Sequence, residues 1–357
     1  MTRPRRTAAL TQALRMVAPG RELREGIDRI LQAGMGALII LGDGPEVLAL
    51  CSGGFLFDAE FTPQRLSELA KMDGAIILSA DATRVARANV HLVPDPDIPT
   101  NETGTRHRTA ERVARQVDVA VVSVSEDMSV VSLYRHEAKH TLAPIPRVLA
   151  RANQALQTLE RYKARLDAVA ASLSALEVED LVTARDVVTV LQRTEMVRRI
   201  AAEIEEYVVE LGTDGRLVML QLEELMGGVE ADRRLVSKDY MVQGPDYELE
   251  DVVTRLTELD NEELLDLRKV LDTLHLPPGA TLDTPLQPHG FRLLHKIPRL
   301  PELVADHVVQ RFESLQKVMR ASVEELNDVE GVGEARARAI KEGLSRLAES
   351  SILDRYV

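Results

Sequence analysis

The sequence predicts an α/β N-terminal domain with a mixed sheet, followed by an all-α spine and an all-α C-terminal domain. Short apolar runs rich in β-branched residues have the length and composition of strands. They span residues 37–42, 46–53, 74–81 and 118–125. Farther along, the segments 150–177 and 178–211 keep apolar residues at helical spacing and contain no Gly or Pro. The change from strand-like to helical patterns marks the end of the first domain.

Two further segments of the first domain alternate apolar and polar residues. Segments 83–93 and 128–142 have this alternation, which is typical of strands with one wetter face and favours a mixed sheet. Helical patterns at 62–72 and 108–116 lie between the strand-like runs. The segment 93–104, VPDPDIPTNETG, is rich in Pro, Asp and Asn, so we expect a loop there.

The remainder of the chain is helical in pattern with two interruptions. LGTDGR at 211–216 predicts a turn, and the Pro-rich segment 275–290 predicts a linker. Beyond the linker, residues 291–349 predict four or five short helices. We therefore divide the chain into three domains, which cover residues 1–145, 146–288 and 289–357.

Composition excludes several classes of protein. The 357 residues carry a net charge of −13, which argues against indiscriminate nucleic-acid binding and restricts any DNA contact to a defined module. Cys51 is the single cysteine, so an internal disulfide and a cysteine-based zinc cluster are excluded. The apolar runs are too short for a membrane span, and the basic start has no apolar region of a secretory signal after it. We expect a cytoplasmic protein with no membrane partner.

The C-terminal region contains a candidate phosphate clamp. Gly331-Val332-Gly333 stands between two short helical patterns, where glycines allow a sharp turn and a close backbone approach. The N–H groups that open the next helix suit a phosphate. The spacing resembles the helix-hairpin-helix motif, and residues 291–312 resemble a second copy with few glycines. Such paired hairpins grip the DNA backbone without reading bases. The alternative is a plain helical hairpin in which Gly331 is a C-cap.

Basic side chains accompany this hairpin. Arg336, Arg338 and Lys341 follow the glycines, and Arg299 lies in the turn of the upstream copy. Positive and negative charges nearly balance between residues 291 and 346, so this region is the part of the chain that a polyanion repels least. We predict that these four residues contact DNA, although an ordinary solvated face would have the same composition.

A second basic cluster lies in the first domain. GTRHRT, residues 104–109, places Thr105, Arg106, His107, Arg108 and Thr109 at the start of a helical pattern. Arginine forks match phosphate oxygens, threonine hydroxyls add donors, and a helix start adds N–H groups and a favourable dipole. Neither GxxxxGK[ST] nor GxGxxG occurs in the chain. The two arginines could equally pair with nearby acids.

An acidic residue offers the complementary chemistry. Asp73 lies between a helical pattern and a strand-like run, and Gly74 follows it. A carboxylate there can hold a divalent cation or accept a proton from a hydroxyl, and the glycine lets a base or a phosphate approach the backbone. Taken alone, Asp-Gly at such a junction is an ordinary turn.

Together, DGA at 73–75 and GTRHR at 104–108 resemble the diadenylate cyclase domain. With the helical spine and the terminal hairpin module, the whole chain resembles the DNA integrity scanning family of bacterial cyclic di-AMP synthases. The resemblance implies that two ATP molecules condense to cyclic di-AMP with release of two diphosphates. It also implies Mg²⁺ or Mn²⁺ as the cofactor, because one carboxylate plus substrate phosphates is a common way to hold such ions.

The resemblance implies roles for individual residues. Asp73 would bind the metal and activate the 3′-oxygen. Arg106, His107 and Arg108 would complete the catalytic set and hold the triphosphate; His107 would either ligate the metal or bind phosphate. The predicted ATP site comprises Gly74, Ala75, Leu92, Gly104, Thr105, Arg106, His107, Arg108, Thr109 and Ser125.

The product also predicts an assembly. Cyclic di-AMP is two-fold symmetric, whereas the chain carries one DGA and one RHR, so two domains must face each other. By resemblance, further copies of the chain are expected as partners in a homo-octamer with facing cyclase domains. DNA is the other expected partner, at the nucleoid. The domain order motivates the hypothesis that branched recombination intermediates bound at the C-terminal module lower synthesis.

Three rival functions stay open. A non-catalytic DNA-repair scaffold would bind nucleotide without turning it over. A helix-hairpin-helix glycosylase or lyase would need a nucleophilic lysine after the hairpin, whereas Lys341 lies within its second helix and the first domain is α/β. Adenylyl transfer to another acceptor would use the same site, and only the product would distinguish it.

Overall fold

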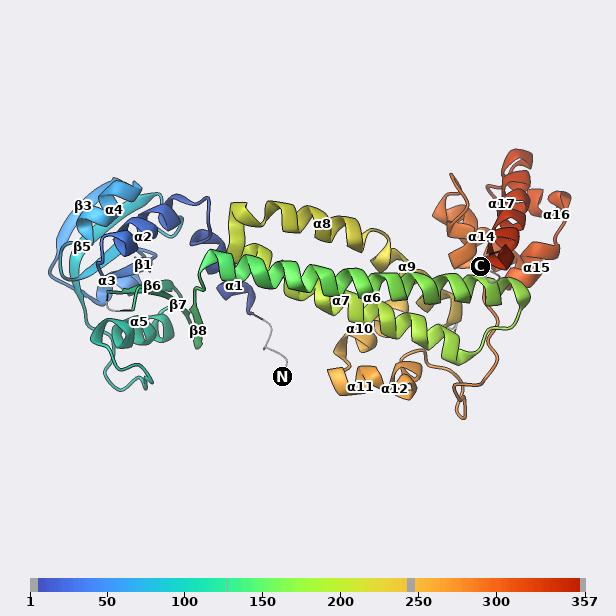
Figure 1. Ribbon diagram of the computed structural model, residues 1–357, viewed down its shortest axis with the longest axis horizontal. Coiled ribbons are helices and arrows are strands. Elements are labelled where there is room, and N and C mark those ends of the chain that lie inside the picture. The colour runs from blue at the N-terminus through green and yellow to red at the C-terminus, as the bar shows by residue number, and fades with distance from the viewer. Residues whose placement is uncertain (1–5, 127, 243–247, 354–357) are drawn as a thin grey trace. The chain divides into compact units, whose positions relative to one another are not determined.

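The computed structural model describes residues 6–126, 128–242 and 248–353 (Figure 1). The chain folds into two compact units. One comprises Met1–Ala155 with Glu203–Gln221, and the other Leu156–Ala202 with Leu222–Val357. The basic residues 1–5 of the expected non-secretory start lie outside the described residues. The boundaries of the three predicted domains stay a prediction.

An eight-stranded mixed sheet forms the centre of the first unit. Its order is β2-β5-β4-β1-β6-β7-β8, with β3 beside β5. Strands β1 and β4 are parallel and the other pairs are antiparallel, which confirms the predicted mixed sheet. The strands are β1 Ala37–Leu41, β2 Cys51–Ser52, β3 Phe55–Glu60, β4 Ala75–Leu78, β5 Arg84–Leu92, β6 Ala120–Ser125, β7 Val130–Arg135 and β8 Ala138–Thr141.

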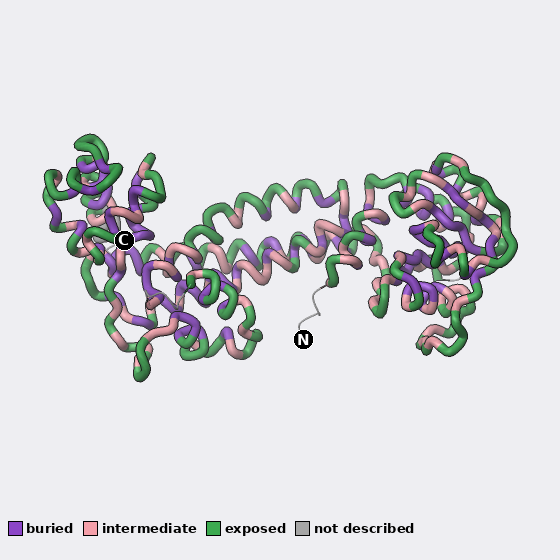
Figure 2. The backbone as a smooth tube through the Cα atoms, turned by 180° about the vertical axis from the view of Figure 1, so that it is seen from behind, coloured by how far each residue is buried: buried purple, intermediate pink, exposed green. Residues whose placement is uncertain are grey.

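Helices cover both faces of this sheet (Figure 1). Alternate residues of a strand point to opposite faces, so β1 sends Ile39 towards α1 (Ala8–Met16), α2 (Glu22–Gln32) and α4 (Pro63–Leu69). Ile40 points to the other face, against α3 (Pro45–Ala49) and α5 (Thr105–Gln116). Because both faces are covered, the central strands are mostly apolar in sequence, and Figure 2 colours them as buried.

The predicted strand at 46–53 is wrong. Pro45–Ala49 forms α3, and Cys51–Ser52 alone makes a short strand. Pro45 stands at the first helical position and Glu46 in the first turn, where both favour a helix. Val47 is buried on the sheet, so its apolar character reflects packing against the sheet. Strand β3, which the sequence analysis does not anticipate, runs beside β5.

The long helical patterns are confirmed with shifted ends. Helix α6 spans Ile145–Glu179 and α7 spans Ala184–Leu211, so the second pattern begins later than residue 178. Asp180 has φ +58°, outside the helical region. Asp186 then accepts hydrogen bonds from the backbone and hydroxyl of Thr183, at 2.9 and 2.6 Å, and restarts the helix.

Shorter helices follow α7. The turn predicted at 211–216 contains a 3₁₀ helix, Gly212–Gly215. Gly228, with φ +77°, separates α8 from α9, so one predicted helical stretch becomes two helices. Residues 275–290 form turns and one isolated bridge, as expected for a linker. The helices are α8 Arg216–Met226, α9 Val229–Tyr240, α10 Leu249–Glu258, α11 Asn261–Leu265 and α12 Leu267–Asp272.

Five helices complete the described C-terminal region, as the sequence analysis predicts. They are α13 Phe291–His295, α14 Glu302–Phe312, α15 Leu315–Arg320, α16 Val323–Asn327 and α17 Glu334–Leu353. Their apolar faces share one core.

A buried ion pair anchors α13 within the second unit. Nη2 of Arg292 lies 2.6 Å from Oε2 of Glu177, and both side chains are 1% exposed. The hydroxyl of Tyr240 donates to the same carboxylate at 2.8 Å. Asp239, which is fully buried, accepts the backbone N–H groups of Gly290, Phe291 and Arg292 at 2.7–2.8 Å. Burial foremost, with Glu177 nearby, raises the pKa of Asp239 to about 7.

A second buried carboxylate joins α7 to the sheet within the first unit. Glu210 is 6% exposed and lies 2.7 Å from Nη2 of Arg6 and 3.2 Å from Nε2 of His140 on β8. Burial alone would raise its pKa, but the neighbouring His140 and the hydrogen-bonded Arg6 outweigh burial and lower the pKa to about 2. A depressed carboxyl pKa stabilises the fold above the unfolded pKa, and this contribution is lost as the pH falls towards the folded value.

We expect Glu210→Gln to destabilise the first unit by about 3 kcal/mol at pH 7, since each pKa unit corresponds to about 1.4 kcal/mol. The difference from wild type should shrink as the pH falls from about 5 to about 2, because the wild-type carboxylate becomes protonated over that range. Calorimetric unfolding of both proteins at several pH values measures this difference in the free energy of unfolding. Glu206→Gln is the control, because Glu206 is 29% exposed and lies 3.7 Å from Arg6. A deficit that stays constant with pH would contradict the ionic explanation.

Candidate active site and DNA interface

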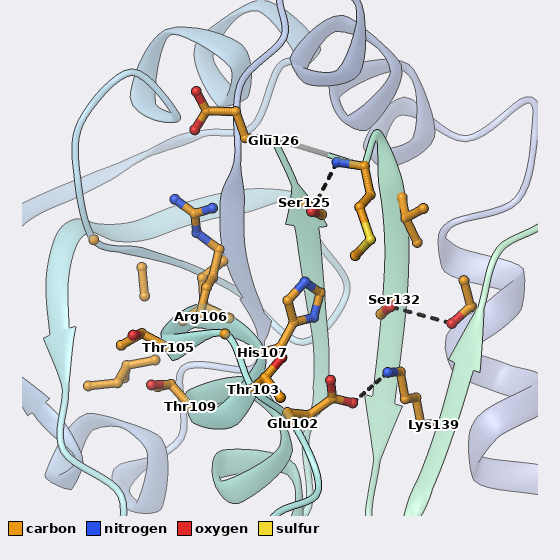
Figure 3. A pocket seen from close by; sticks show the side chains of 18 of the residues that line it. Glu102, Thr103, Thr105, Arg106, His107, Thr109, Ser125, Glu126, Ser132 and Lys139 are labelled. Atoms are coloured by element: carbon orange, nitrogen blue, oxygen red, sulfur yellow. Dashed lines mark hydrogen bonds and ion pairs between the residues drawn. The ribbon is translucent and has the colours of Figure 1, made fainter.

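One edge of the sheet carries a pocket of about 880 Å³. Strands β1 and β4 begin at this edge, while β5 and β6, which run antiparallel to them, end there. This topology brings together Gly74 before β4, Leu92 at the end of β5 and Ser125 at the end of β6. The volume suits one nucleotide-sized ligand. Segments far apart in the chain therefore meet in one cavity (Figure 3).

The first turn of α5 supplies the basic wall of the pocket. The helix begins at Thr105, whereas the sequence predicts a start at 108, so the basic cluster lies inside the helix. Gly104 is its N-cap and offers no capping side chain. The N–H groups of the first turn thus lack helical partners and suit an anion. Thr105, Arg106 and Thr109 line the cavity beside these groups (Figure 3).

Arg106 lies against a residue that the sequence analysis misses. A Cβ at Gly36 would stand 2.0 Å from Nη1 of Arg106, so a larger residue at position 36 would displace this guanidinium from its observed position. Gly36 directly precedes β1 and carries no sequence signal of its own, because the contact joins distant segments.

Gly74 is required by the backbone and by packing. Its φ is +130°, and an added Cβ would meet the backbone of Asn89 on β5 at 2.8–2.9 Å. The following Ala75 is 1% exposed and pairs with Leu38 of β1. The fold by itself therefore requires glycine at position 74, apart from the predicted role of Gly74 in admitting a ligand.

Two of the predicted catalytic residues do not line this pocket. Arg108 is exposed, since its neighbour Arg106 occupies the inner side of the helix turn and adjacent helical residues point in different directions. Asp73 is also exposed, although the next residue, Gly74, lines the pocket. Of Asp73, Arg106 and Arg108, only Arg106 therefore lines the pocket of a single chain, and the convergence of all three on one triphosphate stays a prediction. The other predicted ATP-site residues line it: Gly74, Ala75, Leu92, Gly104, Thr105, Arg106, His107, Thr109 and Ser125.

The pocket also contains polar residues that the sequence analysis misses. Glu102 comes from the loop before α5, Ser132 from β7, and Lys139 and Thr141 from β8 (Figure 3). The alternation of segment 128–142 could have marked Ser132 as facing the same side of the sheet as Val130 and Tyr134, opposite to Val131 and Leu133. Only the pairing of β7 with β8 places Lys139 near it.

The environment of His107 shifts its titration. Its Nδ1 lies 2.9 Å from the hydroxyl of Tyr134, which is buried. Burial lowers the pKa of His107, the charges of Lys139 and Arg106 lower it further, and the carboxylate of Glu102 opposes the change.

The C-terminal hairpin has the geometry of a phosphate clamp. Gly331 has φ +81°, Val332 is buried, and Gly333 opens α17. A Cβ at Gly333 would meet nothing within 4 Å, so the protein's own packing does not require glycine there. The upstream segment 291–312 forms α13 and α14 around a turn, as the predicted second copy requires.

The basic side chains predicted to contact DNA differ in how far contacts within the protein already engage them. Arg336 donates to the carbonyl of Gly331 at 2.6 Å, and Lys341 donates to the carbonyl of Met319 at 2.7 Å. Arg338 is exposed and pairs with Glu334 one turn away. Arg299 is exposed in the upstream turn, with φ +63°. Arg338 and Arg299 are thus better placed to meet a ligand than Lys341, which is partly buried.

No helix in the described part of the chain is long and apolar enough to cross a membrane.

Three protein families match the chain. Residues 24–139 match the DisA bacterial checkpoint controller nucleotide-binding family. Residues 142–282 match the DisA bacterial checkpoint controller linker region, and residues 314–343 match the helix-hairpin-helix motif. The first match spans the pocket, and the third covers the glycine hairpin.

Relatives match over nearly their whole length. The DNA integrity scanning protein DisA of Parafrankia sp. is 56% identical over 346 residues, which are 96% of each chain. That of Streptomyces coelicolor is 56% identical over 349 residues, 97% of this chain and 93% of the relative. Among solved structures, DacA from Staphylococcus aureus has 21% identity and a TM-score of 0.31, covering 37% of this chain and 88% of that one. The chain therefore belongs to the DNA integrity scanning protein DisA family, with its nucleotide-binding domain, its linker and a helix-hairpin-helix motif.

Proposed function

We propose that this protein condenses two ATP molecules into cyclic di-AMP and two diphosphates, and that DNA bound at the hairpin lowers the rate. The observation that carries the catalytic part is the convergence on one pocket of a helix start with Arg106, His107 and two threonines. Ser125 faces them from the end of β6 (Figure 3). These groups offer donors for a triphosphate, and Leu92 with Gly74 offers an apolar surface for adenine.

The reaction is a double nucleotidyl transfer. Each ribose 3′-oxygen attacks the α-phosphorus of the other ATP, the new P–O bond forms, and the bond from the α-phosphorus to the bridging oxygen of the diphosphate breaks. The 3′-proton leaves to a base, and negative charge develops on the departing diphosphate. Arg106 and the N–H groups of α5 can stabilise that charge from fixed positions.

One chain supplies only part of the machinery for this reaction. Its pocket can hold one ATP, whereas Asp73 and Arg108 are exposed outside it. In an isologous pair, the Asp73 of each protomer can reach the nucleotide held by its partner. The exposure of these two residues thus supports facing cyclase domains, and we extend the proposal to the homo-octamer that the family resemblance implies.

The residues present fit Mg²⁺ or Mn²⁺ held jointly with substrate. No hydrogen bond or ion pair engages the exposed carboxylate of Asp73 within the described residues. Nor do those residues contain a group of three or more His, Cys, Asp or Glu that could hold a metal by itself. Asp73 would therefore share the ion with phosphate oxygens. When bound, the ion offsets triphosphate charge and acidifies the 3′-hydroxyl.

The proposal is tested by incubating the protein with ATP and Mn²⁺ or Mg²⁺ and identifying the nucleotide product by mass. Cyclic di-AMP with two diphosphates per molecule is expected. Absence of any product under both metals would favour the non-catalytic DNA-repair scaffold. Adenylate attached to another acceptor would favour simple adenylyl transfer.

For the DNA part, we expect Gly333→Leu to weaken binding of branched DNA about 10- to 100-fold, since one or two hydrogen bonds to a charged phosphate are lost. Thermal stability should hardly change, because a Cβ at this position meets nothing within 4 Å. Fluorescence anisotropy at fixed salt measures the affinity. Gly44→Leu is the matched control, because a Cβ at this helix N-cap also meets nothing within 4 Å. Unchanged affinity of Gly333→Leu would exclude this hairpin as the clamp.

The regulatory part is tested by measuring the cyclase rate with and without saturating four-way junction DNA. A fall in rate is expected, because the hairpin and the nucleotide pocket belong to one continuous chain with long unbroken helices between them. An unchanged rate would remove the regulatory proposal and leave the cyclase proposal intact. If the fall is seen, we place this activity in the cytoplasm at the nucleoid.

A further inference from the structure

The nucleotide pocket extends along the sheet beyond the residues that the sequence predicts. Its walls follow the strand order β5-β4-β1-β6-β7-β8. Leu92 and Gly74 lie at the β5–β4 end of the pocket, and Lys139 lies at the β8 end. Arg106 stands between these ends, because its guanidinium lies against Gly36, the residue that precedes β1. Neighbouring strands lie about 4.8 Å apart, so the distance along the sheet from β4 to β8 is about 19 Å.

This order of residues along the sheet matches the order of chemical groups along ATP. Under the proposed function, adenine lies on Leu92 and Gly74, and the first turn of α5 with Arg106 meets the phosphate nearest the ribose. In Figure 3, Arg106, Ser125 and Ser132 follow one another in this order across the pocket. An extended nucleoside triphosphate has a length of the same order as the pocket. An ATP that lies along the sheet therefore brings its β- and γ-phosphates to β7 and β8.

Lys139 supplies positive charge at the β8 end. Among the described residues that line the pocket from β6 to β8, it is the only basic one, and Glu126 after β6 is acidic. The Lys139 ammonium pairs with the carboxylate of Glu102, and the lysine side chain is 42% exposed. An ammonium has three donors, so the carboxylate can hold it in place while the others meet a ligand. In protein kinases a Lys–Glu pair likewise positions the lysine that binds phosphate.

Hydroxyl groups form the floor beside Lys139. Ser132 pairs with Thr141 across β7 and β8, their hydroxyl oxygens lie 3.5 Å apart, and both residues line the pocket. Ser123 of β6 pairs with Ser132 and with Leu38, which also lines the pocket, so Ser123 points to the same face of the sheet. The Ser123 side chain is 0% exposed, and within the described residues its hydroxyl has no hydrogen-bond partner. Because buried hydroxyls are nearly always hydrogen-bonded, this one is an independent sign that a polar ligand group belongs to the floor.

We propose that Lys139, with the hydroxyls of Ser132 and Thr141, binds the β- and γ-phosphates of ATP at the β7–β8 end of the pocket. We call these three residues the terminal-phosphate subsite. The assignment rests on the proposed function and extends it, since the β- and γ-phosphates are the part of ATP that leaves as diphosphate. Glu102 is then a positioning residue, which holds the Lys139 ammonium at the pocket wall. The subsite distinguishes ATP from AMP by charge and by hydrogen bonds that AMP cannot receive.

Binding without turnover tests the subsite. Isothermal titration calorimetry of the full chain in EDTA, where the divalent cation is removed, compares the affinities for ATP and AMP. Wild type should bind ATP more tightly than AMP. Lys139→Gln should weaken ATP binding about 10- to 100-fold, because a charge-assisted hydrogen bond is lost, while the affinity for AMP should hardly change. Thr141→Val, which keeps the shape of the side chain, should weaken ATP binding about 3- to 10-fold.

Two controls separate the subsite from indirect effects. Glu102→Gln combined with Lys139→Gln removes both charges of the pair, so a loss of ATP affinity that persists in this double variant cannot come from an unpaired carboxylate. Lys163→Gln is the matched lysine control and should bind ATP as wild type does, because Lys163 pairs with Asp167 at 2.6 Å on α6, away from the pocket.

The outcomes distinguish the subsite from the cyclase function. Unchanged ATP affinity in Lys139→Gln, equal losses for ATP and AMP, or full recovery in the double variant would each refute the subsite. A wild type that prefers ATP through Lys139 but makes no cyclic product with Mn²⁺ or Mg²⁺ would refute the cyclase function alone. A wild type that binds neither nucleotide would refute both.

Discussion

Asp73→Asn should abolish cyclic di-AMP formation, with a fall in kcat of at least about 1,000-fold, while ATP still binds. Asparagine keeps the shape of the side chain but removes the charge that holds a cation and accepts a proton, and such groups contribute about 100- to 10,000-fold. Affinity for ATP should change little, because Asp73 is exposed and does not line the pocket that its own chain offers. Product mass and ATP titration measure the two effects. Loss of ATP binding together with turnover would contradict this placement.

Mixing variants tests whether Asp73 acts on the nucleotide of a facing protomer. An Asp73→Asn protomer keeps Arg106, and an Arg106→Ala protomer keeps Asp73. A mixed pair therefore has one nucleotide site with both residues intact and one site with neither. We expect the mixture to form one phosphodiester bond and release a linear dinucleotide with one diphosphate. Asp28→Asn is the control, because Asp28 pairs only with Arg24 on the outside of α2. A mixture no more active than its separate components would exclude the facing arrangement.

Arg292→Met should destabilise the second unit by about 3–5 kcal/mol, the usual cost of leaving one partner of a buried ion pair without the other. Glu177 would remain 1% exposed with Tyr240 as its main donor. For a unit of this size, the unfolding temperature should fall on the order of 10 °C. Calorimetry or circular dichroism measures the shift, and the hairpin module should become sensitive to protease.

The control for Arg292 is another arginine pair of the same unit. Arg185 pairs with Asp283 at 3.0 Å, but the two side chains are 51% and 81% exposed. Arg185→Met should therefore cost less than about 1 kcal/mol. A double replacement of Glu177 and Arg292 by Met should recover part of the lost stability, because no unpaired charge is left buried. Equal effects of the two single arginine variants would contradict the role of burial.

The regular elements with strong periodicity are confirmed. The central strands at 37–42, 74–81 and 118–125 are mostly apolar because both faces of the sheet are covered, and that composition is visible in the chain. The error at 46–53 has the same origin. A short apolar run that is buried on a sheet has the same sequence pattern whether it is a strand or a helix. In this segment the proline at its start favoured the helix.

The candidate site was predicted from side-chain chemistry, which does not say in which direction each side chain points in the fold. Arg106 and Arg108 read alike in the sequence, but the helix begins three residues earlier than predicted and turns only Arg106 into the pocket. Tyr134 and Glu102 were missed because they carry no motif: Tyr134 is recognised by its contact with His107, and Glu102 by its place in the pocket wall.

The sequence by itself determined the family, the mixed α/β domain with its helical continuation, and the chemical groups available at the two candidate sites. Local pattern suffices for these, because periodicity follows from burial and because phosphate chemistry needs particular side chains. Only the tertiary structure decided which residues share the pocket and that the imidazole of His107 meets the hydroxyl of Tyr134. Those properties depend on the pairing of strands and on hydrogen bonds between segments far apart in the chain, which no local pattern encodes.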